Sequence, residues 1–133
     1  MTEKDRQDIL QLVHDYCAAI AALDEDRFAA LWTGHDDETV ISITHDYHGP
    51  EEVLGGFLAK LRELYTSIVL VEDDEPSVRP LTDDVAIVVF RYHTETVRAA
   101  TGEPDGIEGI ETQVVRRTAD GWRLAHIHYS KKA

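Results

Sequence analysis

The last quarter of the chain, residues 107–130, constrains the fold more than any other stretch. Two runs rich in apolar and β-branched residues flank Asp120-Gly121, a dipeptide that favours a tight turn between antiparallel strands. The second run carries His126 and His128, which are two positions apart and therefore point to the same face of one strand. The stretch predicts a β-hairpin that presents a pair of histidines on one face.

A longer strand is predicted at residues 85–96, because its side chains alternate between two faces. One face carries Ala86, Val88, Phe90, Tyr92 and Thr94. The other face begins with Val85, Ile87 and Val89 and ends with Arg91, His93 and Glu95. A strand that lines a core and then a pocket has the second pattern, and so has a strand that leaves the core and meets water. We expect the charged end of this face to border either a pocket or solvent.

The first half of the chain has helical spacing. Residues 2–5 match a capping box, which begins a helix that runs to about Leu23, and Asp24 suits the N-cap of a short second helix. A third helix is expected to begin near Pro50. Helices followed by a run of strands indicate an α+β fold, in which a curved antiparallel sheet carries helices on one face. The length suits a single domain spanning residues 1–133.

Charge and cysteine content exclude several classes of partner. The formal net charge of −13 argues against nucleic acid and against anionic membranes, because binding to phosphate requires clustered lysine and arginine. The single cysteine, Cys17, rules out an internal disulfide and a cysteine-based metal site, and its place on a helical apolar stripe indicates a small buried residue. Since no signal peptide or long apolar run is evident, we expect a cytoplasmic protein without membrane partners.

The order of these elements resembles the nuclear-transport-factor-2-like, or SnoaL-like, superfamily, and most closely the association-domain branch of calmodulin-dependent protein kinase II. The resemblance covers nearly the whole chain, and three motifs carry it. They are Phe90-Arg91, Glu111-Thr112 and the final GWRLAHIHYS, which contains Gly121, Trp122, His126, His128 and Ser130. The resemblance implies a cone-shaped fold with a pocket between the concave face of the sheet and the helices. It also implies a homodimer formed through the sheet, with a larger ring as the alternative.

The resemblance further implies roles for individual residues. Arg91 matches a pocket arginine of the kinase branch, whereas Gln113 stands where a second arginine would be, so we expect a less basic pocket. Tyr16 matches the oxyanion-hole tyrosine of the ketosteroid isomerase relatives. The general-base aspartate of those isomerases falls near Ser42, which is not a base at neutral pH. The expected ligand-binding residues are Tyr16, Trp32, Arg91 and Gln113, although Trp32 is most simply a core residue.

The faces of the strands decide which groups can perform catalysis. If Arg91 and Gln113 share the concave face, as the resemblance implies, antiparallel pairing places His93 close to Glu111 on that face. A histidine beside a carboxylate can act as a general acid or base near neutral pH. His93 and Glu111 are therefore candidate catalytic residues, and Glu111 is also the expected counter-charge of Arg91.

His126 and His128 are further candidates whose face depends on the final turn. A two-residue turn places both on the face of Gln113, whereas a three-residue turn or a bulge turns them to the opposite face. Paired histidines on a sheet also serve as hydrogen-bonded spacers or dimer contacts, which is the simpler interpretation. With Glu111 or His93 they could hold a metal, but the chain has seven histidines, such pairs arise by chance, and we expect no metal.

Two functions are compatible with the sequence. The first is cofactor-free proton transfer, by isomerisation, dehydration or cyclisation, on a small and partly apolar organic molecule. In that case His93, or His126 or His128 paired with Glu111, would move the proton. Tyr16 and Arg91 would stabilise an enolate oxygen. The second is a non-catalytic module for oligomerisation or ligand sensing, as the kinase resemblance implies. A fold does not choose between them, since one fold hosts many activities.

Overall fold

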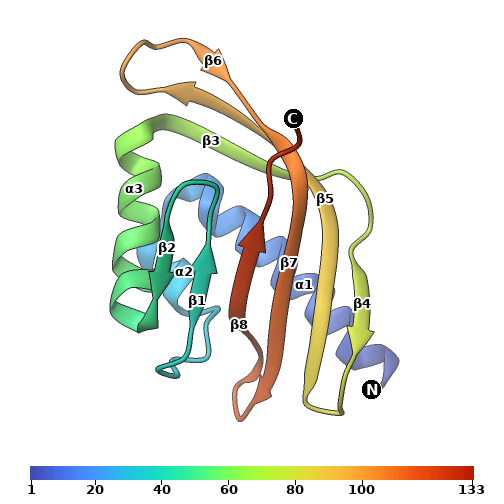
Figure 1. The fold of residues 1–133 in the computed structure, drawn as a ribbon. Coiled ribbons are helices and arrows are strands. Elements are labelled where there is room, and N and C mark those ends of the chain that lie inside the picture. The colour runs from blue at the N-terminus through green and yellow to red at the C-terminus, as the bar shows by residue number, and fades with distance from the viewer.

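The computed structural model describes residues 1–133 as helices packed against one strongly curved sheet (Figure 1). The helical elements are α1 (Glu3–Ala22), α2 (Glu25–Ala29), the π-helical η1 (Glu51–Gly56) and α3 (Phe57–Leu64). The strands are β1 (Thr39–Ile41), β2 (Asp46–His48), β3 (Tyr65–Glu72), β4 (Ser77–Pro80), β5 (Val85–Arg98), β6 (Pro104–Asp105), β7 (Glu108–Thr118) and β8 (Gly121–Tyr129). The predicted α+β class is confirmed, with β1 and β2 lying between α2 and η1.

The strand order along the sheet is β2-β1-β8-β7-β5-β3. The pairings are antiparallel except that of β1 with β8, which is parallel. The long strand β5 holds the sheet together, because β4 pairs with its first half while β3 and β6 pair with its second half. Figure 1 shows α1 running behind the sheet and α3 standing beside β2 and β3, so the helices cover the concave face. None of the helices is both long enough and apolar enough to cross a membrane.

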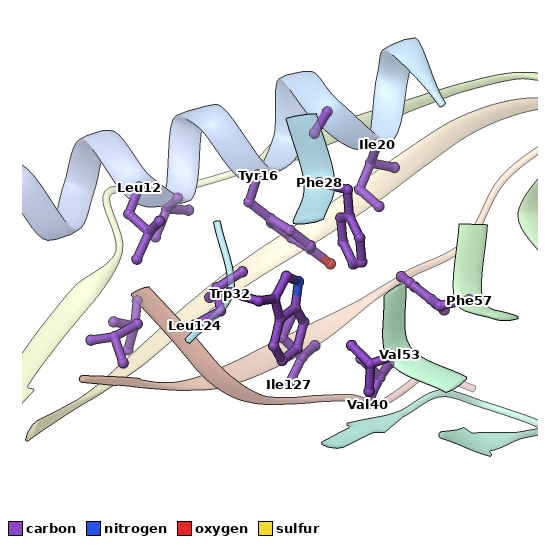
Figure 2. Close-up of a cluster of buried hydrophobic side chains, with 14 of the residues drawn as sticks. Leu12, Tyr16, Ile20, Phe28, Trp32, Val40, Val53, Phe57, Leu124 and Ile127 are labelled. Atoms are coloured by element: carbon purple, nitrogen blue, oxygen red, sulfur yellow. The ribbon is translucent and has the colours of Figure 1, made fainter. Parts of the chain in front are cut away.

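The core lies between α1 and the concave face of the sheet. The helix begins at the Thr2 capping box, as predicted, and ends at Leu23, whose φ of 50° is left-handed. Figure 2 shows Leu12, Tyr16 and Ile20 directed from this helix toward the sheet. They belong to a cluster of 22 buried residues, and burying each large apolar side chain contributes about 1.5–3 kcal/mol.

The predicted hairpin of β7 and β8 is confirmed, although its turn lies one residue earlier than expected. Thr118 pairs with Gly121, so the turn residues are Ala119 and Asp120. The Thr118 hydroxyl donates to the carbonyl oxygen of Gly121 at 2.8 Å and accepts from the backbone N–H of Asp120 at 3.1 Å. Gly121 has a φ of 110°, which glycine adopts without steric cost.

A β-bulge in β8 decides which residues of that strand face the core. Beyond Leu124 the register with β7 shifts by one residue, so Ala125 is an extra, bulged residue. One extra residue inverts the faces of everything that follows it. Leu124 and Ile127 are consequently both fully buried, although they are three positions apart. His126 and His128 lie on the outer face of the sheet.

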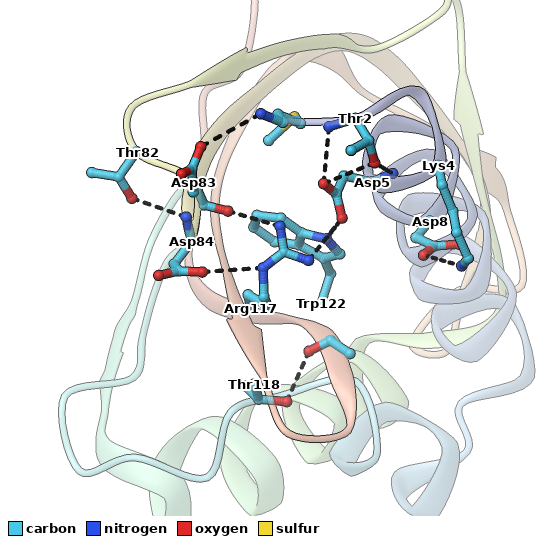
Figure 3. A network of polar contacts seen from close by, with 12 residues as sticks. Thr2, Lys4, Asp5, Asp8, Thr82, Asp83, Asp84, Arg117, Thr118 and Trp122 are labelled. Atoms are coloured by element: carbon cyan, nitrogen blue, oxygen red, sulfur yellow. Dashed lines mark hydrogen bonds and ion pairs between the residues drawn. The ribbon is translucent and has the colours of Figure 1, made fainter.

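Asp5 ties the start of α1 to the tip of the hairpin (Figure 3). Its Oδ1 accepts a hydrogen bond from Nη1 of Arg117 at 2.8 Å and one from Nε1 of Trp122 at 3.2 Å. Its Oδ2 accepts from the backbone N–H of Thr2 at 3.0 Å. The Arg117 guanidinium, followed by the Thr2 and Trp122 donors, holds the pKa of Asp5 far below its usual value. This contact anchors the first turn of α1 to the sheet.

Replacing Asp5 by asparagine should lower the melting temperature at pH 7 by several degrees. A carboxylate whose pKa is depressed in the folded protein stabilises it above the unfolded pKa of about 3.9, and this effect is lost as the pH falls. We therefore expect the deficit of Asp5→Asn to shrink below about pH 4. Thermal melts followed by circular dichroism across this range test the expectation.

Asp8→Asn is the matched control, because Asp8 pairs only with the exposed Lys4, at 2.8 Å on the surface of the same helix. An exposed pair of this kind contributes little to stability. Equal melting temperatures for the two variants at pH 7 would contradict the role given to Asp5.

Candidate functional site

A cavity of about 340 Å³ opens between the concave face of the sheet and the helices α1 and α3. Its apolar wall is formed by Ile20, Phe57, Leu61, Leu64, Ile68 and Leu70. Small-molecule sites in proteins are concave, largely apolar and about 300–1,000 Å³ in volume, so this cavity lies at the small end of the range. It is the natural candidate for a ligand site.

Glu111 on β7 is the carboxylic acid buried in this cavity, and only 1% of it is exposed. The Tyr16 hydroxyl, from α1, donates a hydrogen bond to its Oε1 at 3.2 Å. The side-chain amide of Gln113 donates to its Oε2 at 2.7 Å. Both partners are neutral, so neither compensates the negative charge of the ionised carboxyl group.

Burial raises the pKa of Glu111 to about 7, because removal from water disfavours the charged form. The hydrogen bonds from Gln113 and Tyr16 oppose this effect, and the negative charge of Glu72 adds to it. At neutral pH the group is therefore divided between its acid and its base form. A general acid–base catalyst works best with such a pKa.

Two further tyrosines, Tyr92 and Tyr129, line the same cavity. Their rings meet edge to face at 6.0 Å, and the Tyr92 hydroxyl donates to the backbone oxygen of Ser130 at 2.7 Å. Burial and the nearby charge of Glu111 raise the pKa of both phenols, as they do for Tyr16, so all three remain protonated donors. The buried part of the cavity thus combines one carboxyl group with several neutral hydroxyl donors.

The face of β5 that lines the cavity is the one opposite to Arg91. In the observed register Phe90 pairs with Glu111, and Arg91 pairs with Ile110. The expectation that Arg91 and Gln113 share the concave face is therefore wrong, because Arg91 lies an odd number of positions from the residues that face Glu111. Arg91 is exposed on the outer face, with its Nη1 at 3.8 Å from Asp74.

His93 also lies outside the cavity, and its expected approach to Glu111 does not occur. Its Nδ1 is 2.5 Å from Asp73 and its Nε2 is 3.1 Å from Glu95, on the outer face. These hydrogen bonds, first that of Asp73, raise the pKa of His93. In that position the imidazole pairs with surface carboxylates and does not reach a ligand in the cavity.

His126 and His128 lie on the outer face because of the Ala125 bulge, with their ring centroids 6.5 Å apart. Burial, followed by the charge of His128, lowers the pKa of His126. Trp32 packs in the core, 5.7 Å from the ring of Phe28, and does not line the cavity. Of the residues expected at the site, the structure brings together Tyr16, Glu111 and Gln113.

Tyr92 and Tyr129 line the cavity although neither is among the residues that the sequence predicts at the site. The signal for Tyr92 was present, because Tyr92 and Thr94 end the apolar face of the predicted strand 85–96 and so make that face gradually polar. Tyr129 follows Ile127 at the strand period of two, but only after the bulge is known.

Other reactive groups do not form a second centre. No group of three or more histidine, cysteine, aspartate or glutamate side chains is arranged to hold a metal ion. Cys17 is half-buried, and burial raises the pKa of its thiol, so it stays protonated at neutral pH.

Comparison with known proteins identifies a family and several folds of the same kind. The profile of the SnoaL-like domain matches residues 9–133. No curated protein matches the chain. A nuclear transport factor 2-like superfamily protein from Salmonella enterica serovar Typhimurium superposes with a TM-score of 0.94 at 23% identity, covering 100% of this chain and 94% of that one.

Two other solved structures are similar in fold. A protein from Streptomyces avermitilis, proposed to be a dehydratase of the same superfamily, has a TM-score of 0.85 at 21% identity and covers 99% of each chain. A protein from Xanthomonas campestris, proposed to be a calcium/calmodulin-dependent protein kinase II association domain, has a TM-score of 0.77 at 19% identity, over 93% of this chain and 85% of that one. At these identities the similarity shows a shared fold.

Glu111→Gln should stabilise the protein in neutral and alkaline solution. Folding raises the pKa of this carboxyl group from 4.5 to about 7. The protein therefore loses about 3 kcal/mol of its free energy of unfolding as the pH rises through that window, and the loss persists at higher pH. Glutamine carries no charge and can accept from Tyr16. Its amide can donate to Oε1 of Gln113, which has no partner in the wild-type protein.

We expect Glu111→Gln to melt about 5–10 °C above the wild type at pH 8 and close to it at pH 4.5. Thermal melts at both pH values measure the difference. Glu108→Gln is the control, since Glu108 lies on the same strand but is exposed and 3.8 Å from Lys132. A stability difference for Glu111→Gln that does not change with pH would contradict the raised pKa.

Proposed function

Because the chain belongs to the SnoaL-like domain family, whose profile spans residues 9–133, we propose that it is a cofactor-free enzyme that transfers a proton on a small, largely apolar organic molecule. The observation that carries the proposal is Glu111, a buried carboxyl group with a pKa of about 7 and neutral partners in an apolar cavity. Buried groups of perturbed pKa in a cleft are typical of catalytic sites.

In the proposed reaction the ionised form of Glu111 removes a proton from a carbon of the bound molecule. Each oxygen of the carboxylate accepts one hydrogen bond, Oε2 from Gln113 and Oε1 from Tyr16, and each keeps a lone pair that can take the proton. The Tyr129 hydroxyl lines the cavity as a neutral donor that can stabilise negative charge on a substrate oxygen. The protonated Glu111 then returns the proton to another carbon, in an isomerisation, or to a leaving hydroxyl group, in a dehydration.

The dehydratase proposed for Streptomyces avermitilis supports the choice of chemistry. Loss of water across a carbon–carbon bond requires a base that removes a proton from carbon and an acid that protonates the departing oxygen. A single carboxyl group with a pKa near the working pH can perform both steps in turn.

The experiment that tests the proposal is proton exchange with solvent. The protein is incubated in D₂O with a panel of small cyclic and aryl ketones, and deuterium incorporation at the carbon beside the carbonyl is measured by mass spectrometry. We expect the wild type to exchange at least one member above the buffer rate, increasingly as the pH rises through 7. Glu111→Gln should lower the rate at least about 100-fold.

Glu108→Gln again serves as the control and should exchange at the wild-type rate. Exchange by Glu111→Gln at the wild-type rate would remove Glu111 from the mechanism. Ketones that bind in the cavity without exchange in the wild-type protein would favour the alternative function, a non-catalytic ligand-sensing or assembly module. The similarity to the protein from Xanthomonas campestris, proposed to be an association domain, is the observation that favours this alternative.

We also propose that the outer face of the sheet joins two copies of the chain, as the SnoaL-like resemblance implies. Val69, Val89 and Ile110 lie on this face on three neighbouring strands and are 46%, 37% and 44% exposed. Val89 and Ile110 are close together, since Ile110 pairs with Arg91 two residues from Val89, whereas Val69 pairs with Glu95 farther along β5. Exposed apolar side chains on one face are typical of protein interfaces.

Sedimentation velocity tests this pairing. We expect the wild type to sediment as a dimer and Val89→Asp as a monomer, because the cross-strand neighbours of Val89 are Ser77 and Thr112, which offer a buried carboxylate no cation. Leu81→Asp, in the turn between β4 and β5, is an exposed control that should remain dimeric. A monomeric wild type at micromolar concentration would contradict the proposal.

A further inference from the structure

The mouth of the cavity carries positive charge, although the chain has a formal net charge of −13. Lys60, Arg98 and Lys131 line it, and Asp105 is the only carboxylate there apart from Glu111. Two other surface hollows are acidic and contain no lysine or arginine; one contains Asp36, Glu51 and Glu52, and the other Glu72, Asp74 and Glu75. A further hollow contains Arg91 and Lys132, which Asp73 and Glu108 match in number, so the excess of cations is a local feature of this cavity.

The three cations approach the mouth from different elements. Lys60 comes from α3, Arg98 from the end of β5, and Lys131 from the segment after β8. Figure 1 shows the hairpin of β5 and β6 and the C-terminus at the same end of the fold as the end of α3. A ligand that enters between these elements meets at least one cation on its way.

The lysines are the cations that remain available to a ligand. Arg98 is committed to Asp105, since its Nε donates to Oδ2 at 2.7 Å. The charge of Lys131 also helps to lower the pKa of Asp105, after the Gly106 backbone N–H and Arg98, so Lys131 lies near this pair without forming an ion pair of its own. Lys60 is 3.3 Å from Glu63, whose side chain is 69% exposed, and a pair of this kind is weak.

The distance from the mouth to Glu111 suits a small molecule. Tyr129 is the strand partner of Glu111, and Lys131 follows Tyr129 by two positions in extended chain, which is roughly 7 Å. The backbone N–H groups of Ser130 and Lys132 donate to Ile110 and Glu108 of β7, so the extended conformation continues past the end of β8. The flexible lysine side chain adds several ångströms of reach.

We propose that the substrate is an amphipathic organic anion, such as a carboxylate with an apolar body. Its charged head stays at the mouth with Lys60 and Lys131, and its body crosses the apolar wall and presents the reactive carbon to Glu111. The arrangement keeps the anion in contact with water, where its charge costs little, and at a distance from the ionised Glu111. The inference rests on the proposed function, whose substrate class it names.

Matched pairs of probes test the charge of the head separately from the body. The pairs are 4-phenylbutyrate with 4-phenyl-1-butanol, and hexanoate with 1-hexanol. Each is titrated into the full-length protein at low ionic strength and pH 6, where Glu111 is mostly protonated, and binding is followed by amide chemical shifts. We expect each acid to bind about three- to tenfold more tightly than its alcohol, and ~0.5 M NaCl to reduce this preference.

Two variants test whether Lys60 and Lys131 cause the preference for the acid over the alcohol. Lys60→Gln combined with Lys131→Gln should abolish the preference for the acid and leave the affinity for the alcohol unchanged. Lys132→Gln should keep it, because Lys132 is the neighbour of Lys131 in sequence but lies against Glu108, outside this cavity. All three lysines are on the surface, and melting temperatures equal to that of the wild type show that the variants are folded.

The outcomes separate this inference from the proposed function. If the alcohol shifts the amides of Tyr92 and Tyr129 as strongly as the acid does, or if the double variant keeps the preference, the anionic substrate is wrong and the role of Glu111 is unaffected. If no probe shifts any cavity residue, the cavity does not accept small apolar molecules and both proposals fail. If Glu111→Gln keeps full proton exchange while the acid preference holds, the function alone fails.

Discussion

Burying Glu111 without a charged partner is the constraint on which the site depends. The carboxyl group takes two hydrogen bonds, from Tyr16 and Gln113, and no cation offsets its charge. Keeping it ionised at neutral pH costs about 3 kcal/mol, a large part of the 5–15 kcal/mol by which a domain of this kind is stable. The core must supply that energy elsewhere, and the benefit is a carboxyl group that is both acid and base near pH 7.

The rest of the fold holds the partners of Glu111 in place. Tyr16 reaches the carboxyl group from α1, and the first turn of that helix is anchored eleven residues earlier by Asp5 and its bonds to Arg117 and Trp122. Over these eleven residues, about 16 Å of helix, α1 also buries Ile9, Leu12 and Val13, so the network and the core together hold the Tyr16 hydroxyl. The network at one end of the molecule thus helps to position a donor in the wall of the cavity.

Caps, turns and side-chain alternation made the helices and strands predictable from the sequence. They did not predict which face of each strand points into the cavity. The Thr2 capping box, the Asp24 cap and the alternation at 85–96 placed α1, α2 and β5, and the order of elements gave the α+β class. Tyr16 and Glu111 were selected as site residues, and the structure places them in contact. The roles of Arg91 and His93 failed because both faces of β5 become polar where the strand leaves the helices, so polarity did not distinguish cavity from solvent. The position of His126 depended on one bulged residue, Ala125, which no periodicity encodes.

A direct titration of Glu111 tests the central claim. The side-chain carboxyl carbons of glutamate can be followed by ¹³C NMR between pH 3 and 9, and the resonance missing from the Glu111→Gln variant identifies the residue. An apparent pKa near 7 is predicted for Glu111. A midpoint near the ordinary value of about 4.3 would show that the carboxyl group is solvated and would contradict its use as an acid–base catalyst.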